Sequence, residues 1–306
     1  MTSASATSLD GAVRAAAELL RGAGIDSAEF DAVALAAHVL GKSASEVRRL
    51  MILGGPVPGG FQDLVAERAR RVPLQHLTGK AGFRRLELSV GPGVFVPRFE
   101  TELVAGLVIS HLAGGSLSGR PLGPGGLGGV VVPVVTPVVV DLCTGSGAIA
   151  LAIKDEVPSA EVHAVELSDL AHAWAIRNRD SLGLEVDIRL GDATVAFPEL
   201  VSGVDVVVSN PPYIPVGAVP NDPEVRDHDP EVALYGGSAD GLRIPLAVAD
   251  RAAILLRAGG FFVMEHADVQ GGSLPRMLRS TGWWRDIQDH VDLNGRPRAV
   301  TAVRCG

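Results

Sequence analysis

The sequence predicts an α/β fold: a mostly parallel β-sheet covered by helices on both faces and preceded by a small helical domain. From Val138 onward, short β-branched runs alternate with helical stretches, which is the pattern of βαβ units. Between Leu9 and Val72, apolar residues instead recur every three or four positions, as in helices that pack on one another. The length of 306 residues suits two domains, because one domain typically takes roughly 150.

The first 75 residues are assigned to an N-terminal helical domain. Gly, Pro and Ser residues separate four amphipathic segments, and the third opens with Ser43 and Glu46 at the spacing of a capping box. The expected helices cover residues 10–21, 26–40, 43–53 and 58–71.

A β-hairpin is expected in residues 76–99, which link the domains. Leu86, Leu88 and Val90 alternate with polar residues, and a Gly-Pro-Gly sequence at 91–93 interrupts the run before residues 94–96. The turn of the hairpin is therefore predicted at residues 91–93.

The sheet domain is expected over residues 100–306. It begins with a helix at 100–112, followed by a flexible surface insertion at 114–129, where eight of sixteen residues are glycine. The last two strands are too close in sequence for a crossover helix, so they should be antiparallel. The expected strands are 138–142, 161–166, 186–190, 204–209, 261–265, 283–289 and 298–303.

Composition excludes several classes of protein. The formal net charge of −8 counts against a protein that grips a long stretch of nucleic acid backbone, although Arg68, Arg70, Arg71, Arg84 and Arg85 form either a basic patch or a solvated surface. Two distant cysteines cannot form a disulfide framework, and no basic, apolar leader opens the chain, so a cytoplasmic location is expected. The longest apolar run, 130–140, is too short to cross a membrane.

A nucleotide site is predicted at the end of the first strand. Residues 141–147 run from this strand through a glycine turn into a helix, and glycines let a backbone approach a ligand closely. Glu166, nineteen residues after Gly147, ends the second strand, where a carboxylate can accept both ribose hydroxyls. A dinucleotide site is disfavoured but not excluded, because Ala150 stands at the third glycine position. Asp192, after the third strand, could meet the amino group of an adenine.

The reacting end is predicted at Asn210-Pro211-Pro212-Tyr213, after the fourth strand. Two prolines stiffen this segment and remove two N–H donors, so its carbonyl groups are presented outward. The Asn210 side-chain oxygen and the Pro211 carbonyl could each accept one N–H of a substrate NH2 group, turning the nitrogen lone pair toward an electrophile. Tyr213 would pack on the planar group.

These motifs resemble the release factor glutamine methyltransferases (PrmC/HemK family). Asn-Pro-Pro-Tyr alone is shared with adenine-methylating enzymes, whereas further blocks of the chain are specific to this family. The resemblance extends over residues 10–304 outside the glycine-rich insertion. The blocks that carry it are 73–79, 91–102, 141–147, 210–213, 229–237 and 240–242.

The resemblance implies a Rossmann-like class I methyltransferase, with a seven-stranded, mostly parallel sheet whose terminal strand is antiparallel. It implies S-adenosyl-L-methionine as cofactor, S-adenosyl-L-homocysteine as product, and class-1 peptide chain release factors as partners recognised by the helical domain. The residues carried over to the cofactor are Cys143, Thr144, Gly145, Ser146, Gly147, Glu166, Asp192, Ala193 and Asn210. Those carried over to the glutamine are Asn210, Pro211, Pro212 and Tyr213, with Asn210, Pro211 and Tyr213 acting in catalysis.

The chain departs from the family pattern at four places. Phe99 stands where Pro is usual, Cys143 where Gly is common, and Ala193 where an aromatic residue can occur. The sequence Met-Glu-His-Ala at 264–267 lacks the glycine that often follows the family's Glu-His or Glu-Ile. No metal is expected, because the histidines lack ligand spacing. A monomer without stable nucleic acid binding is expected. The acidic residues of 222–231 are interpreted as a solvated lid, with contact to a basic release factor surface as the alternative.

Two rival functions remain open. One is an adenine-N6 methyltransferase on DNA or RNA, which the acidic charge and the absence of a large recognition domain disfavour. The other is a catalytically silent cofactor-binding protein, which the intact Asn210–Tyr213 segment opposes.

Overall fold

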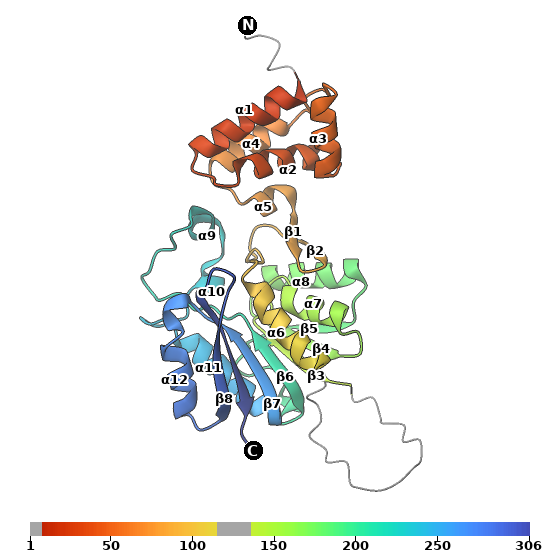
Figure 1. The fold of residues 1–306 in the computed structure, drawn as a ribbon. Coiled ribbons are helices and arrows are strands. Elements are labelled where there is room, and N and C mark those ends of the chain that lie inside the picture. The colour runs from red at the N-terminus through yellow and green to blue at the C-terminus, as the bar shows by residue number, and fades with distance from the viewer. Residues whose placement is uncertain (1–7, 115–135) are drawn as a thin grey trace, which may run out of the picture. The chain divides into compact units, whose positions relative to one another are not determined.

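The computed structural model describes residues 8–114 and 136–306, and these fold into two compact units (Figure 1). The first unit contains Met1–Lys80, Val90–Pro92 and Val219–Asp229, and the second contains Ala81–Ser89, Gly93–Ala218 and Pro230–Gly306. The predicted glycine-rich insertion at 114–129 lies outside the described residues, apart from Gly114. Within the described ranges, no helix combines the length and the hydropathy needed to span a membrane.

The first unit is a helical bundle with its own apolar core. Leu9, Leu20, Leu35, Val47 and Phe61 are buried in it. The capping box predicted at Ser43 and Glu46 is confirmed, with the Ser43 hydroxyl accepting from the Glu46 N–H and the Glu46 carboxylate accepting from the Ser43 N–H. All four predicted helices are present. A fifth helix was not predicted, because it is too short to show the three-to-four-residue spacing of apolar residues in the sequence. The helices are α1 (Leu9–Gly22), α2 (Ala28–Leu40), α3 (Ala44–Ile52), α4 (Phe61–Ala69) and α5 (Leu74–Thr78).

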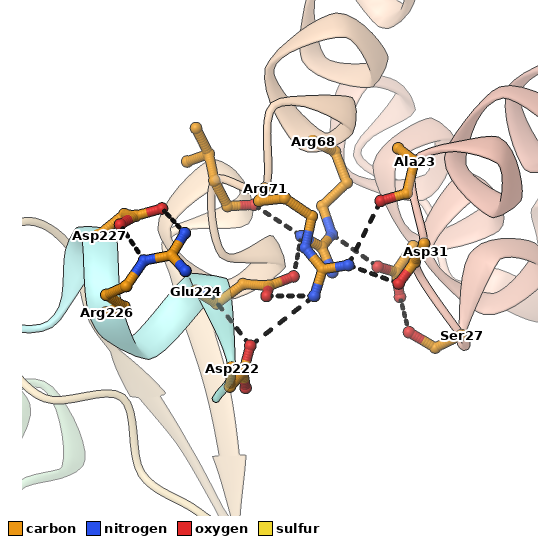
Figure 2. A network of polar contacts seen from close by, with 11 residues as sticks. Ala23, Ser27, Asp31, Arg68, Arg71, Asp222, Glu224, Arg226 and Asp227 are labelled. Atoms are coloured by element: carbon orange, nitrogen blue, oxygen red, sulfur yellow. Dashed lines mark hydrogen bonds and ion pairs between the residues drawn. The ribbon is translucent and has the colours of Figure 1, made fainter. Parts of the chain in front are cut away.

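A sixth helix of this unit comes from far along the chain. Helix α9 (Pro223–His228) is fixed by a buried ion-pair network (Figure 2). The Arg68 guanidinium donates to Asp31 and to Glu224, each at 2.7 Å, and Arg71 donates to the other Glu224 oxygen at 2.5 Å. The interpretation of the acidic residues of 222–231 as a solvated lid is therefore wrong for Glu224 and Asp229, which are both buried. The surface interpretation of Arg68 is wrong as well, because Arg68 and Glu224 pair in a buried position.

The turn of the hairpin begins seven residues earlier than predicted. Strands β1 (Lys80–Phe83) and β2 (Leu86–Ser89) flank a turn at Arg84 and Arg85, so the alternating run of residues 86–90 supplies the second strand rather than the first. Arg84 adopts a left-handed φ of 52°, which no Gly or Asn signals in the sequence. Its side chain is held by ion pairing with Glu156, and its N–H donates to Glu102.

The second unit is built on a seven-stranded sheet in the order β5-β4-β3-β6-β7-β9-β8. Strands β3 to β7 are parallel, and β9 runs antiparallel to both β7 and β8, as predicted for the terminal strand. The predicted strand at 261–265 begins five residues earlier, with a bulge in its pairing to β6. The strands are β3 (Val138–Leu142), β4 (Glu161–Glu166), β5 (Val186–Leu190), β6 (Val204–Ser209), β7 (Leu256–Glu265), β8 (Trp284–Val291) and β9 (Pro297–Arg304).

Helices cover both faces of this sheet (Figure 1). Because successive strand residues point to opposite faces, Val139 and Val206 enter one core, whereas Val140 and Val207 enter the other. The first core is closed by α6 (Thr101–Ala113), α7 (Ala148–Glu156) and α8 (Asp169–Leu182), and the second by α11 (Arg243–Leu255) and α12 (Ser273–Ser280). The chain winds from β3 outward to β5 and then returns to β6. The strand order thus reverses between β3 and β6, which is where open α/β sheets bind ligands.

Candidate active site

The register of the sheet brings the predicted site residues to one edge. Leu142, the last residue of β3, pairs with Val165 of β4 and with Ser209, the last residue of β6. The Ser209 hydroxyl also donates to the Leu142 carbonyl at 2.5 Å. The turn that follows β3, the end of β4 and the segment that follows β6 therefore lie beside one another, on the two sides of the reversal point.

The turn after β3 leaves room for a ligand on one side only. Gly145 has a φ of +60°, and a Cβ added to it would meet nothing within 4 Å. Gly147 faces the protein instead, because its Cβ would lie 2.9 Å from Leu151. Cys143 also has a left-handed φ, of 68°, which explains why glycine suits this position. The predicted turn therefore exposes its backbone at Gly145 and packs tightly at Gly147.

Glu166 is oriented by two backbone donors. Its Oε2 accepts from the Gly145 N–H and its Oε1 from the Ser168 N–H, both at 2.8 Å. The half-buried carboxylate keeps further lone pairs for two hydroxyl groups, since each oxygen can accept more than one bond. This geometry fits the vicinal hydroxyls of a ribose.

Asp141 supports the turn through a hydrogen bond with Thr144, a role that the sequence analysis did not assign to it. Its buried carboxyl accepts from the Thr144 hydroxyl at 2.6 Å, and its Oδ1 has no hydrogen-bond partner among the described residues. Burial raises the pKa of Asp141 to about 7, against the Thr144 hydrogen bond, which lowers it. Asp141 therefore fixes Thr144 within the turn.

Asp192 and Ala193 lie in the turn after β5. The exposed Asp192 accepts from the Thr194 N–H and hydroxyl, each at 2.8 Å, which is an Asx-type turn. Ala193 is buried in the second core of the sheet. The contacts of Asp192 and Ala193 with an adenine stay a prediction.

The backbone is clamped where the Asn210–Tyr213 segment ends, at Tyr213 and the following Ile214. The Ile214 N–H donates to the Leu234 carbonyl at 2.8 Å, and the Gly236 N–H donates to the Ile214 carbonyl at 2.9 Å. The Gln270 side chain donates to the Tyr213 carbonyl at 2.9 Å. The clamp comes from α10 (Glu231–Leu234), the loop that follows it, and the short helix Asp268–Gln270.

One glycine packs directly on this segment, and a second glycine packs on the first. A Cβ on Gly236 would lie 1.8 Å from the Gly241 carbonyl oxygen, and a Cβ on Gly241 would lie 2.1 Å from the Tyr213 carbonyl oxygen. Both glycines belong to the sequence blocks at 229–237 and 240–242. Each block thus supplies a glycine to the packing behind the reacting segment, which their distance along the chain did not reveal.

The side chains of the segment have buried partners. Asn210 donates from Nδ2 to the Thr101 hydroxyl at 3.2 Å, and the Tyr213 hydroxyl donates to Glu265 at 3.0 Å. Pro211 and Pro212, which separate Asn210 from Tyr213 in the sequence, are buried. Sequence reasoning missed Thr101 and Glu265, although Thr101 lies in the specific block at 91–102.

Glu265 is the most strongly perturbed carboxyl beside this segment. Burial raises the pKa of Glu265 to about 7, while the hydrogen bonds with Thr101 and Tyr213 and the charge of Arg298 oppose the rise. Burial and the nearby Glu265 carboxyl raise the pKa of Tyr213, so its hydroxyl stays protonated and donates. In the part of the chain that the structure describes, no group of three residues could hold a metal ion.

Two protein-family models match parts of the chain. Residues 11–79 match the PrmC N-terminal domain model, and residues 131–220 match the methyltransferase small domain model. The chain is 47% identical to a release factor glutamine methyltransferase of Streptomyces coelicolor, over 95% of this chain and 96% of that protein.

A second relative acts on another kind of compound. The chain is 38% identical to a 4-amino-L-phenylalanine/4-methylamino-L-phenylalanine methyltransferase of Streptomyces pristinaespiralis, over 98% of this chain and 97% of that protein. Among solved structures, a Thermus thermophilus 16S rRNA N2 G1207 methyltransferase is 21% identical, with a TM-score of 0.48, over 74% of this chain and 49% of that chain.

Proposed function

Because the chain belongs to the release factor glutamine methyltransferase family, we propose that it methylates the glutamine side-chain amide in the Gly-Gly-Gln motif of class-1 peptide chain release factors. S-adenosylmethionine is the methyl donor, and S-adenosylhomocysteine is the product. The helical unit matches the family's N-terminal domain and is proposed to bind the release factor. The protein acts as a monomer and does not bind nucleic acid stably in this proposal.

The turn after β3 and Glu166 hold the cofactor in this proposal. The open side of Gly145 leaves room for the part of the cofactor that lies against the backbone of the turn. The Glu166 carboxylate accepts hydrogen bonds from the two ribose hydroxyls. Asp192 and Ala193 face the adenine from the next turn. When bound, the cofactor supplies an electrophilic methyl group on sulfur.

Asn210 and Pro211 prepare the substrate nitrogen. An amide nitrogen is a poor nucleophile because its lone pair is delocalised, as the rotation barrier of about 18–20 kcal/mol reflects. The Asn210 Oδ1 and the Pro211 carbonyl oxygen each accept one N–H, which turns the nitrogen toward the methyl group and stabilises the positive charge that develops on it. Tyr213 packs on the amide plane, and the nitrogen releases its proton to solvent after transfer.

The orientation of the Asn210 amide is the single observation that carries this assignment. Its nitrogen is engaged by Thr101, so Oδ1 is the atom left to accept from a substrate. The segment lies at the same sheet edge as Glu166 and Gly145, where the family's chemistry requires donor and acceptor to meet.

The test is mass spectrometry of a purified class-1 release factor after incubation with the protein and S-adenosylmethionine. We expect one added methyl group on the Gly-Gly-Gln glutamine, and none when that glutamine is replaced by glutamate. Asn210→Ala should lower the rate by about 100-fold or more, since losing one oriented acceptor commonly costs about 10²–10³. An unmodified glutamine with wild-type protein contradicts the proposal.

A parallel reaction separates the second candidate. The relative named for 4-amino-L-phenylalanine shares the full length of the chain, so an arylamine is tested as substrate beside the release factor. Methylation of 4-amino-L-phenylalanine without methylation of the release factor would assign this chain to the small-molecule reaction. Methylation of an adenine-containing oligonucleotide alone would assign it to the nucleic acid reaction.

A further inference from the structure

A buried asparagine on α8 joins two parts of the sheet unit that are far apart in sequence. Asn178 is fully buried, and a buried polar side chain is stable only when its groups are hydrogen-bonded. Its Nδ2 donates to the Ser146 carbonyl and to the Ser89 carbonyl, each at 3.0 Å, and its Oδ1 accepts from the Ser89 N–H at 2.7 Å. Ser146 belongs to the turn after β3, and Ser89 is the last residue of β2.

We propose that Asn178 is a positioning residue for S-adenosylmethionine. It fixes the backbone of the turn at residues 143–147, the cofactor turn, from inside the protein, and it orders the end of β2 together with this turn. Asn178 does not touch the cofactor and acts through the Ser146 carbonyl. The inference rests on the part of the proposed function that assigns this turn to the cofactor.

Helix α8 contacts both parts of the cofactor site. Ser168, which caps the start of α8, donates its N–H to Glu166 Oε1. Ala175 and Asn178, further along, are three residues apart and therefore share one face of the helix. A Cβ added to Gly147 of the cofactor turn would lie 3.5 Å from the Ala175 Cβ. One rigid helix thus sets the spacing between the Glu166 carboxylate and the cofactor turn.

The Asn178 amide is satisfied in one orientation only. The Ser89 N–H can only donate, so it must face Oδ1, and both protons of Nδ2 are then directed at the two carbonyl oxygens. A reversed amide would place Oδ1 against two acceptors and leave them without a donor. Because Ser146 is itself buried, its carbonyl depends on Nδ2 for a partner. The Ser89 N–H therefore fixes the amide, and the amide fixes the Ser146 carbonyl.

A cofactor turn that is not held must be ordered when the cofactor binds. Glycine loses more conformational freedom on ordering than any other residue, and this turn contains Gly145 and Gly147. The cost of ordering reduces the free energy of binding, so a preformed turn binds more tightly. The three bonds of Asn178 do not involve residues 210–213. We therefore expect their loss to weaken cofactor binding and to leave the chemical step nearly unchanged.

The first experiment removes the donor and keeps the shape. Asn178→Asp retains an acceptor for the Ser89 N–H but places a carboxylate oxygen against the two carbonyl oxygens. We expect the calorimetric Kd for S-adenosylmethionine to rise about 10- to 100-fold, because two donated bonds are lost. At saturating S-adenosylmethionine, kcat with a release factor should stay within about threefold of wild type. Asn294→Asp, the same change at an exposed position between β8 and β9, is the matched control and should bind the cofactor normally.

The second experiment uses wild-type protein, so it does not depend on whether a variant folds. Hydrogen–deuterium exchange is followed by mass spectrometry in peptides that contain Ser89 or the cofactor turn, with and without saturating S-adenosylmethionine. Because the Ser89 N–H is bonded to Asn178, we expect the cofactor to slow its exchange about tenfold or more, together with that of the turn. The Val138 N–H, bonded to Asp205 Oδ2 at the other end of β3, is the control and should exchange at an unchanged rate.

Two results overturn the inference. One is a folded Asn178→Asp variant whose Kd for S-adenosylmethionine lies within about twofold of wild type. The other is wild-type protein in which the cofactor slows exchange in the cofactor turn but not at Ser89. Both measurements follow cofactor binding and do not require methyl transfer. Wild-type protein that binds the cofactor but leaves the release factor unmodified would therefore contradict the proposed function alone.

Discussion

At the scale of single residues, the site depends on groups whose orientation is fixed by the protein before any ligand arrives. Glu166 is held by two backbone N–H groups, Asn210 by Thr101, and Tyr213 by Glu265. Orientation of this kind lowers the cost of arranging the reacting groups during catalysis. The effect of a substitution here is therefore expected in binding or rate more than in stability.

Glu166→Ala should weaken the binding of S-adenosylmethionine. Two hydrogen bonds to a charged group are lost, each worth roughly 1.5–3 kcal/mol, so the Kd should rise by at least about 100-fold. Isothermal titration calorimetry measures it. Glu161→Ala, at the opposite end of β4, is the control and should bind normally. Unchanged affinity in Glu166→Ala would remove the ribose assignment.

Gly241→Ala should disrupt methyl transfer without preventing cofactor binding. The added Cβ would lie 2.1 Å from the Tyr213 carbonyl oxygen, so the reacting segment must move. Gly217→Ala is a matched control, since Gly217 has a similar left-handed φ but no atom within 4 Å of its added Cβ. We expect kcat to fall by about 10²-fold in the first variant and little in the second. Equal activity of the two variants would show that contact with Gly241 does not position Tyr213.

At the scale of elements, the sequence predicted what local patterns determine. Alternation, β-branching and caps located the parallel strands and the first four helices, because these signals lie within one element. The hairpin turn was misplaced, because Arg84 adopts a conformation that its residue type does not signal.

Partners that are distant in sequence were not predictable from such patterns. The bonds from Arg68 to Glu224 and from Asn210 to Thr101 span 156 and 109 positions, and each residue alone resembles an ordinary surface side chain. The candidate site was therefore predicted at the strand ends, where topology places ligands, whereas its buried supports were not.

The ion-pair network of α9 should make the helical unit sensitive to acid. Burial acts to raise the pKa of Glu224, but hydrogen bonds including those from Arg71 and Arg68 outweigh it and lower the pKa to about 2, below the ordinary 4.5. The stabilisation is therefore complete above pH 4.5 and is lost as pH falls toward 2. Glu224→Gln should lower the free energy of unfolding at pH 7 by about 1.5–3 kcal/mol, as expected for a hydrogen bond to a charged group.

Urea unfolding followed by far-ultraviolet circular dichroism measures this effect. Glu231→Gln, an exposed site on α10, is the control and should change stability little. The difference between wild type and Glu224→Gln should shrink between pH 5 and pH 2. A constant difference over that range would show that the charge of Glu224 does not stabilise the fold.

At the scale of the whole molecule, two units with separate cores imply two separate stabilities. The helical unit has its own buried core, and the sheet unit has two more, one on each face. Residues 219–229 leave the sheet unit after the reacting segment, pack within the helical unit and return at Pro230. The chain thus crosses between the units at several points, while each unit keeps its own packed interior.

A ligand held by one unit should stabilise that unit alone. S-adenosylmethionine at 100 times its Kd adds about 2.7 kcal/mol to the unit that binds it. All three tryptophans, Trp174, Trp283 and Trp284, lie in the sheet unit, so their fluorescence follows that unit, whereas circular dichroism follows the helices of both. We expect the cofactor to shift the fluorescence transition to a higher urea concentration. The part of the dichroism change that comes from the helical unit should keep its midpoint.

Glu224→Gln provides the reciprocal change in the same experiment. The ion-pair network of Glu224 lies in the helical unit. The substitution should therefore lower the urea midpoint of the helical unit, which only dichroism detects, without moving the fluorescence transition. A single transition that moves as a whole, both with the cofactor and with Glu224→Gln, would mean that the crossing segments bind the two units into one cooperative structure. In that case binding at the sheet edge would stabilise the helical unit as well, because neither unit could then unfold while the other stayed folded.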